Sequence, residues 1–160
     1  MKCPCCGHEM TPKYYRLIDY KTFGSYAVAK LLDKKDGGGY DRFKLALQLN
    51  NYRLLARDIG FTVVELKAQI TVRDGNTRSA KDNGIDRNLY LIPVEIMPDS
   101  DVKGYFLTKS NQLHKSLDTK TLPELCLFEE RWGGRRCKGY CDVYNFCPEG
   151  AMVNRVKLEV

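Results

Sequence analysis

Asp19 and Lys21, two positions apart, are the first candidates for chemistry in this sequence. A carboxylate beside a lysine can hold a divalent metal ion while the ammonium group orients or polarises an attacking water. The segment from Tyr14 to Lys21 is rich in β-branched and aromatic residues, which predicts a strand. Alternate residues of a strand share a face, so Leu17, Asp19 and Lys21 point the same way. The plainer interpretation is a surface ion pair on an ordinary strand.

Gln48 and Tyr52 form a second candidate pair. Apolar residues recur with a period near 3.6, which predicts a helix from Asp41, its expected N-cap, to about Asp58. Residues four apart share a helix face, so Gln48 and Tyr52 can project toward one site. Solvent exposure for Gln48 and core packing for Tyr52 are the plainer alternatives. The expected apolar stripe is Phe43, Leu45, Leu49, Tyr52, Leu55 and Ile59.

Four cysteines lie within 22 residues near the C-terminus: Cys126, Cys137, Cys141 and Cys147. The N-terminus lacks the apolar core of an export signal, and thiols stay reduced in the cytosol, so metal ligation is favoured over disulfides. Four thiolates can enclose a tetrahedral zinc ion or a 4Fe-4S cluster. We expect this cluster to hold the fold together.

Cys3, Cys5, Cys6 and His8 form a second cysteine-rich segment, similar to one half of a zinc ribbon. A ribbon needs a second pair of ligands. The segment could recruit His8, His114, an acid or a partner chain to bind zinc, or stay without metal. Alternatively, Cys3 or Cys6 replaces Cys126 in the C-terminal cluster. The simplest interpretation of His114 is a helix-surface residue.

The remaining elements follow from the pattern of apolar residues. Residues 25–32 predict a short helix, and the three glycines of residues 33–41 predict a flexible loop. Clean alternation over 62–72 predicts a half-buried strand with Val64, Leu66, Ala68, Ile70 and Val72 on one face. Residues 89–96 predict a strand whose Pro93 suits a sheet edge or a bulge rather than a central strand, and a helix is expected from about 98 to 117.

Residues 73–88 predict a long exposed loop with a basic, substrate-facing cluster. That cluster consists of Arg73, Arg78, Lys81 and Arg87. Glu65 and Lys67 repeat the acid-x-lysine spacing but lie on the polar face of the strand at 62–72, so we interpret them as a decoy.

The order of these motifs resembles the RecB-like branch of the PD-(D/E)XK nuclease superfamily. The shared features are Asp-x-Lys on a strand, a following helix with Gln-x-x-x-Tyr, and a closing run of three cysteines with an aromatic residue before the second. The segments "DYKT.GS..VAK", "RDG" and "ERWGGRRCKGYC" are most similar to phage relatives of CRISPR-associated iron-sulfur exonucleases. The resemblance covers about Leu17 to Cys147. It implies a Mg²⁺- or Mn²⁺-dependent exonuclease in which Asp19 binds metal, Lys21 stabilises the nucleophile, and Gln48 and Tyr52 position DNA.

Two departures from that family pattern matter. The first cluster ligand is supplied locally by Cys126, and three residues rather than two separate Cys137 from Cys141. The family also has a helix and an acid-bearing strand ahead of the Asp-x-Lys strand, whereas this chain has 18 residues before Asp19. Glu9 is the only acid upstream of Asp19 and could replace the missing ligand. The alternative is therefore a catalytically inactive, truncated nuclease fold that binds nucleic acid or protein as a decoy or inhibitor.

Composition agrees with a folded, nucleic-acid-binding protein. The 160 residues carry a net charge of +6, which suits a phosphate backbone. No apolar run could cross a bilayer, so we expect a cytoplasmic protein of a prokaryote or phage-infected host, with DNA as partner and a protein partner or homo-oligomer possible. The expected fold is α/β, a restriction-endonuclease-like mixed sheet flanked by helices. The expected divisions are a knuckle (1–13), a nuclease-like core (14–122), a cysteine cluster (123–150) and a tail (151–160).

Overall fold

The computed structural model describes residues 6, 13–36, 38–128, 130–132 and 134–155. They form two compact units that divide after Lys103. The first unit contains the whole sheet and its helices, and the second contains four cysteines. The elements are β1 (Tyr14–Phe23), α1 (Ser25–Leu31), α2 (Gly38–Asp58), β2 (Thr62–Val72), α3 (Arg78–Asp82), β3 (Leu89–Val94), α4 (Asp99–Thr119), η1 (Arg136–Lys138) and α5 (Pro148–Arg155).

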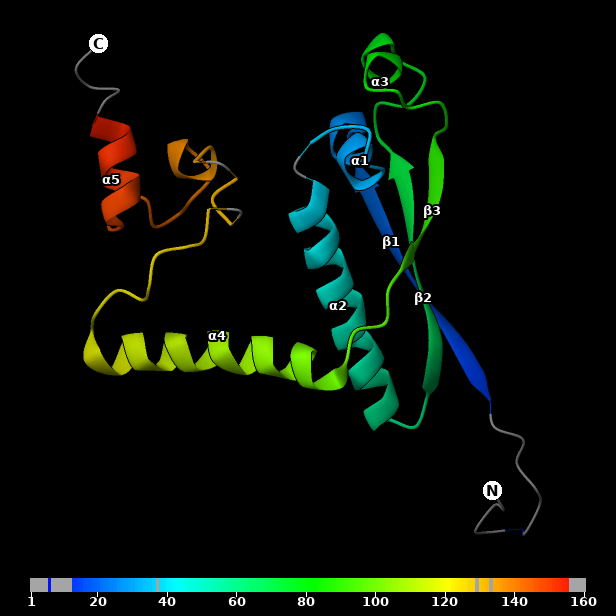
Figure 1. The fold of residues 1–160 in the computed structure, drawn as a ribbon, viewed down its shortest axis with the longest axis horizontal. Helices are drawn as coiled ribbons and strands as arrows, with labels where there is room; N and C mark the ends of the chain where they lie inside the picture. The colour runs from blue at the N-terminus through cyan, green and yellow to red at the C-terminus, as the bar shows by residue number, and fades with distance from the viewer. Residues whose placement is uncertain (1–5, 7–12, 37, 129, 133, 156–160) are drawn as a thin grey trace. The chain divides into compact units, whose positions relative to one another are not determined.

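The first unit is built on a three-stranded mixed sheet with the order β1-β2-β3. β1 runs parallel to β2, and β2 runs antiparallel to β3. Parallel neighbours need a crossover, which α1 and α2 supply on one side of the sheet (Figure 1). Pro93 lies on β3, at an edge of the sheet, as the sequence predicts. The architecture is therefore the mixed α/β arrangement expected.

The core lies between the sheet and the two helices. On β2, Leu66, Ala68, Ile70 and Val72 are buried, as the alternation predicts. Val64 departs from the pattern and is 51% exposed. The reason is a β-bulge at Val64 itself: Tyr15 pairs with Val63 and Arg16 with Glu65, so Val64 is the extra residue and has no partner on β1.

The glycine-rich segment differs from the expected loop. α2 begins at Gly38, so Asp41 lies in the first turn of the helix and is not its N-cap. A Cβ atom on Gly38 would lie 1.9 Å from the carbonyl oxygen of Lys30. Glycine is therefore needed here because the start of α2 passes against the end of α1, whereas sequence reasoning attributed it to flexibility.

The buried face of α2 also differs from the expected stripe. Leu45 and Leu49 are buried as predicted, but Tyr52, Leu55 and Ile59 are exposed. Their place is taken by Leu47, Asn50 and Leu54. Asn50 was not expected in the core because it is polar.

Asn50 is fully buried because all its hydrogen-bonding groups are satisfied. Its amide nitrogen donates to the carbonyls of Ala46 (2.9 Å) and Glu95 (2.8 Å). Its oxygen accepts from the backbone of Met97 (2.9 Å) and from Arg53 (3.2 Å). These bonds fix α2 against the chain that leaves β3.

Residues 73–88 contain a helix where a loop was expected. Thr77 caps α3 by accepting a hydrogen bond from Ala80. Asp74 accepts bonds from the backbone nitrogen (2.6 Å) and the hydroxyl (2.7 Å) of Ser25, which is buried at the start of α1. Asn83 donates to the same hydroxyl (2.8 Å). The segments "GS" and "RDG" are thus joined by a structural network.

The second unit holds most of α4, then η1 and α5. Glu130 accepts hydrogen bonds from Lys109 and from the backbone of Leu127, both at 2.9 Å. Arg131 forms an ion pair with Glu149. Residues 151–155, expected to be tail, belong to α5. Among the described residues, no helix combines the length and the apolar character that a membrane crossing needs.

Candidate active site

Asp19 and Lys21 lie on the face of β1 that the helices cover. Their register partners on β2 are Ala68 and Ile70, which are buried beneath the helices. The Lys21 Nζ atom lies 3.0 Å from Asp19 Oδ2. Both side chains are partly enclosed, since 25% of the Lys21 side chain and 17% of the Asp19 side chain are exposed. The expected shared orientation of the acid and the lysine is what the structure shows.

The Oδ2 atom of Asp19 has an unusual environment. It is buried and accepts no hydrogen bond from the described residues, although the ammonium group of Lys21 is in ion-pair contact. Buried carboxylate oxygens normally have hydrogen-bond donors or a bound cation, because an unsatisfied buried acceptor is costly. This oxygen has the chemistry to accept a hard divalent cation.

Gln48 and Tyr52 face the same region from α2. The amide nitrogen of Gln48 lies 3.0 Å from the hydroxyl of Tyr52, as expected for residues one helical turn apart. Gln48 and Lys21 line one cavity of about 250 Å³. Asp19 and Tyr52 do not line it, but each contacts a residue that does. The structure therefore places one member of each pair, Lys21 and Gln48, at the same cavity, with Asp19 and Tyr52 behind them.

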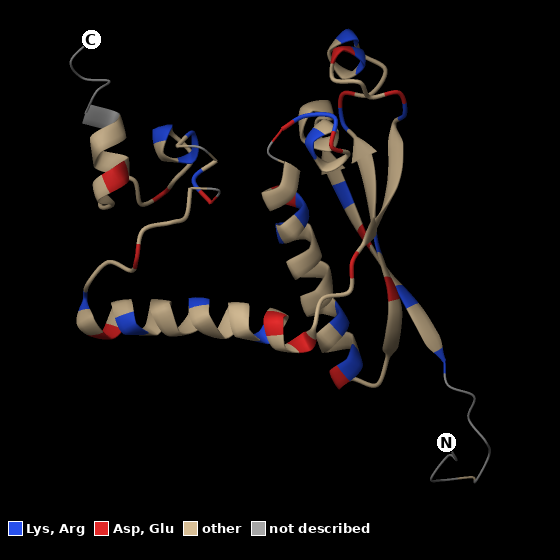
Figure 2. Cartoon of the chain, viewed as in Figure 1, with Lys and Arg blue, Asp and Glu red and all other residues tan. Residues whose placement is uncertain are grey.

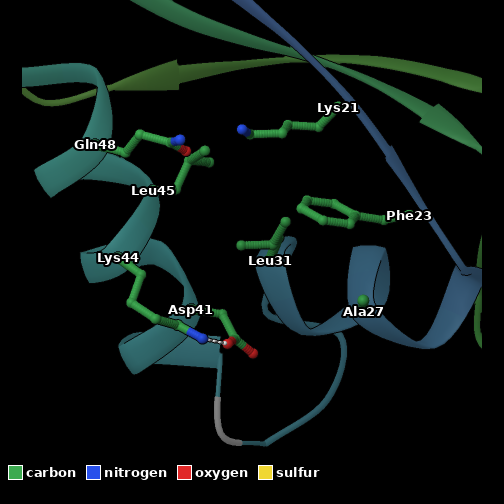
Figure 3. A pocket seen from close by; sticks show the side chains of 8 residues that line it. All are labelled: Lys21, Phe23, Ala27, Leu31, Asp41, Lys44, Leu45 and Gln48. Carbon is green, nitrogen blue, oxygen red and sulfur yellow. Dashed lines mark ion pairs between the residues drawn. The ribbon is translucent and has the colours of Figure 1, made fainter. Parts of the chain in front are cut away.

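The same cavity is lined by residues that sequence reasoning did not select. Phe23, Ala27, Leu31 and Leu45 form its apolar part, and Asp41 and Lys44 its second polar end (Figure 3). Asp41 makes ion pairs with Lys30 (2.8 Å) and Lys44 (2.9 Å). Burial acts to raise the pKa of Asp41, but the hydrogen bonds from these two lysines outweigh it and hold the pKa below its ordinary value. The i, i+3 and i+7 spacing of 41, 44 and 48 on α2 was the available signal.

The acid-x-lysine decoy lies on the other face of the sheet. Glu65 and Lys67 pair in register with Arg16 and Ile18, the positions of β1 that alternate with Asp19 and Lys21. Glu65 forms ion pairs with both Lys67 and Arg16. These hydrogen bonds, led by that from Lys67, hold the pKa of Glu65 below its ordinary value. Glu65 and Lys67 give a natural control for Asp19 and Lys21.

The predicted basic cluster is exposed but not uniformly basic. Arg73, Arg78, Lys81 and Arg87 are all at the surface. Acidic residues lie beside them around α3, as the mixture of red and blue shows in Figure 2. Asp86 accepts a hydrogen bond from Tyr90 (2.6 Å), which is the main reason why its pKa is lowered. A phosphate chain would meet alternating charges here.

The C-terminal cysteines differ in burial. Cys137 is buried, Cys141 and Cys147 are half-buried, and Cys126 is exposed. Burial raises the pKa of the Cys137 thiol, and the nearby thiols of Cys141, Cys147 and Cys126 raise it further. Within the described ranges, no three His, Cys, Asp or Glu side chains are grouped closely enough to hold a metal ion. The four thiols therefore act on one another electrostatically without forming a ligand shell.

Several predicted ligands fall elsewhere. Glu9, Cys3, Cys5 and His8 lie outside the described residues. Cys6 is described and is exposed. His114 is on the exposed surface of α4, as expected.

Comparison of the chain with protein-family models, with curated proteins and with solved structures finds no match in any of the three.

Proposed function

We propose that this chain is a Mg²⁺- or Mn²⁺-dependent nuclease of the RecB-like type, which hydrolyses DNA phosphodiester bonds from an end in the cytoplasm of a prokaryote or phage-infected cell. The observation that carries the proposal is that Lys21 and Gln48 line one cavity and that Asp19 contacts Lys21 beside it. The Oδ2 atom of Asp19 is buried and accepts no hydrogen bond from the described residues, and its contact with the Lys21 ammonium group leaves a carboxylate that could hold a cation at this position.

The proposed roles follow from the geometry of the side chains. Asp19 Oδ2 would hold the divalent ion, which would polarise the phosphate and lower the pKa of a bound water. Lys21, 3.0 Å from that oxygen, is placed to donate a hydrogen bond to the attacking water or to the oxygen on which charge develops. Gln48 and Tyr52 support each other through their 3.0 Å contact and present an amide and a hydroxyl to a DNA strand. Glu9 is the proposed second carboxylate.

We also propose that Cys126, Cys137, Cys141 and Cys147 bind a structural 4Fe-4S cluster, with zinc as the alternative metal. The support is their spacing and the mutual influence of the four thiols on the pKa of Cys137. Metal binding assembles such ligand shells during folding, because thiolates repel one another without the cation. Zinc bound by Cys3 and Cys6 remains part of the proposal for the N-terminal segment.

The cluster proposal is tested on anaerobically purified protein by metal analysis and visible absorption. A broad band near ~400 nm with bound iron is expected, since thiolate-ligated iron-sulfur clusters are coloured. Cys137→Ser and Cys141→Ser should each lose the metal and unfold the second unit, which the fluorescence of Trp132 reports. Stoichiometric zinc in a colourless protein would select the alternative, and metal-free protein that remains folded would refute the proposal.

Nuclease activity is tested with a linear DNA duplex and Mg²⁺ or Mn²⁺. Asp19→Asn and Lys21→Gln should abolish degradation, whereas Glu65→Gln and Lys67→Gln should retain it, because the second pair repeats the same spacing on the opposite face of the sheet. Equal loss in both pairs would contradict the assigned roles. Intact DNA binding without cleavage in the wild-type protein would instead favour the inactive binding module.

A further inference from the structure

The cavity lined by Lys21 and Gln48 has a second polar end, formed by Asp41 and Lys44 on α2. Figure 3 shows Lys21 and Gln48 toward one end, and Asp41 with Lys44 toward the other. Phe23 and Leu31 lie between them in this view, and Leu45 and Ala27 complete the apolar lining. An apolar middle with polar groups at both ends fits a ligand that is itself apolar in the middle and charged at its ends.

The dimensions of the cavity limit what can enter. Its volume of about 250 Å³ is that of a small site, enough for one small organic group. Lys44 and Gln48 are one turn apart on α2, about 6 Å along the helix axis. Successive nucleotides of a stacked strand are about 3.4 Å apart, so several stacked nucleotides would extend beyond the span between Lys44 and Gln48. A longer stretch of DNA would therefore need an open groove. One unstacked nucleotide is the DNA unit that matches these limits.

We propose that this cavity binds the single nucleotide next to the bond that is cut, with its base or sugar against Phe23 and its outer phosphate at Lys44. The proposal rests on the proposed function, since it places the nucleotide beside Lys21. An aromatic ring offers a stacking surface that accepts any base. A pocket for one nucleotide also explains why cleavage would start from an end, because a terminal residue turns in more readily than an internal one.

Asp41 should oppose the binding of a phosphate at Lys44. The lysine that would meet the phosphate already pairs with this carboxylate, 2.9 Å away. A phosphate must therefore compete with Asp41 for Lys44. Removing the acid should strengthen binding, whereas removing the lysine should weaken it. A nonspecific effect on folding would not change sign in this way.

The test is calorimetric titration with thymidine 3′,5′-bisphosphate, one nucleotide with a phosphate at each end, in buffer free of divalent metal. Lys44→Gln should weaken binding by about tenfold, the effect of losing one charge-assisted hydrogen bond. Phe23→Leu should weaken it by roughly fivefold through loss of stacking. Asp41→Asn should tighten it by a few-fold. The matched control Lys103→Gln, at an exposed position on α4, should leave affinity unchanged.

The outcomes separate this inference from the proposed function. If DNA is degraded but the bisphosphate binds equally well to the wild-type, Lys44→Gln and Phe23→Leu proteins, the nucleotide pocket is wrong and the nuclease stands. If no DNA is degraded but the variants change affinity as described, the cavity is a nucleotide-binding site, and both the nuclease and the position next to a cut bond are wrong. Weaker binding in Asp41→Asn would overturn the assignment of Lys44 to phosphate. Circular dichroism of each variant checks that the fold is retained.

Discussion

Asn50→Ala tests whether one buried amide fixes α2, the helix that carries Gln48 and Tyr52. Asn50 has no exposed surface and makes four hydrogen bonds. Two of them reach the backbone of Glu95 and Met97, beyond the end of β3. The substitution leaves that carbonyl and that N–H group without the amide that bonds them.

The expected loss of stability follows from these two bonds. Each intramolecular hydrogen bond contributes about 1 kcal/mol net, and a buried group left without a partner costs about 1–3 kcal/mol. Because Glu95 and Met97 are partly open to water, we expect the lower part of this range for each backbone group. The free energy of unfolding of the first unit should therefore fall by about 2–4 kcal/mol.

Asn51→Ala is the matched control, since the adjacent residue makes the same change in helix propensity. Urea unfolding followed by circular dichroism gives the free energies, and Trp132 fluorescence follows the second unit separately. Asn51→Ala should change stability by less than about 0.5 kcal/mol. Equal stabilities of the two variants would refute the conclusion that the Asn50 bonds anchor α2.

Three other changes address the supports of the cavity. Gly38→Ala should destabilise the first unit by several-fold more than Gly39→Ala, because a Cβ would collide with the Lys30 carbonyl only at position 38; thermal unfolding by circular dichroism compares the two. Ser25→Ala should cost about 1–3 kcal/mol by removing the buried hydroxyl that bonds Asp74, as measured by urea unfolding. The pKa of Asp74 is lowered, chiefly by its hydrogen bond with Ser25, so its stabilising effect is present above the ordinary value of 3.8 and is lost as the pH falls through the lower folded value. Asp74→Asn should therefore be less stable than wild type at pH 7 and show a weaker loss of stability below about pH 4; an unchanged acid dependence would contradict this role.

Much of the sheet could be predicted because its signals are local. The period-2 alternation of β2 fixes which residues are buried, and the same rule places Asp19 with Lys21 on one face of β1. The edge position of β3 followed from Pro93, which cannot donate a ladder hydrogen bond. The acid-x-lysine decoy was recognised for the same reason, since Glu65 and Lys67 fall on the polar face.

The differences arise where a distant contact decides the outcome. Gly38 begins α2, and a glycine is needed there because the Lys30 carbonyl passes close to it. Asn50 replaces Tyr52 on the buried face because backbone groups beyond β3 supply its partners. Asp41 and Lys44 line the cavity because α2 packs near β1, which the sequence does not show. The contacts of Gly38 and Asn50 have no pattern within a short window of sequence, and the spacing of residues 41, 44 and 48 shows a shared helix face without showing what that face meets.

The most direct test of the central claim is paramagnetic broadening by Mn²⁺ in the amide spectrum of the ¹⁵N-labelled protein. The proposed metal position predicts the strongest broadening at Asp19, Lys21 and their register partners Ala68 and Ile70. Asp19→Asn should abolish this pattern, and Glu65→Gln should preserve it. Broadening that persists in Asp19→Asn, or that centres on Glu65, would contradict a divalent-metal site on the helix-covered face of β1.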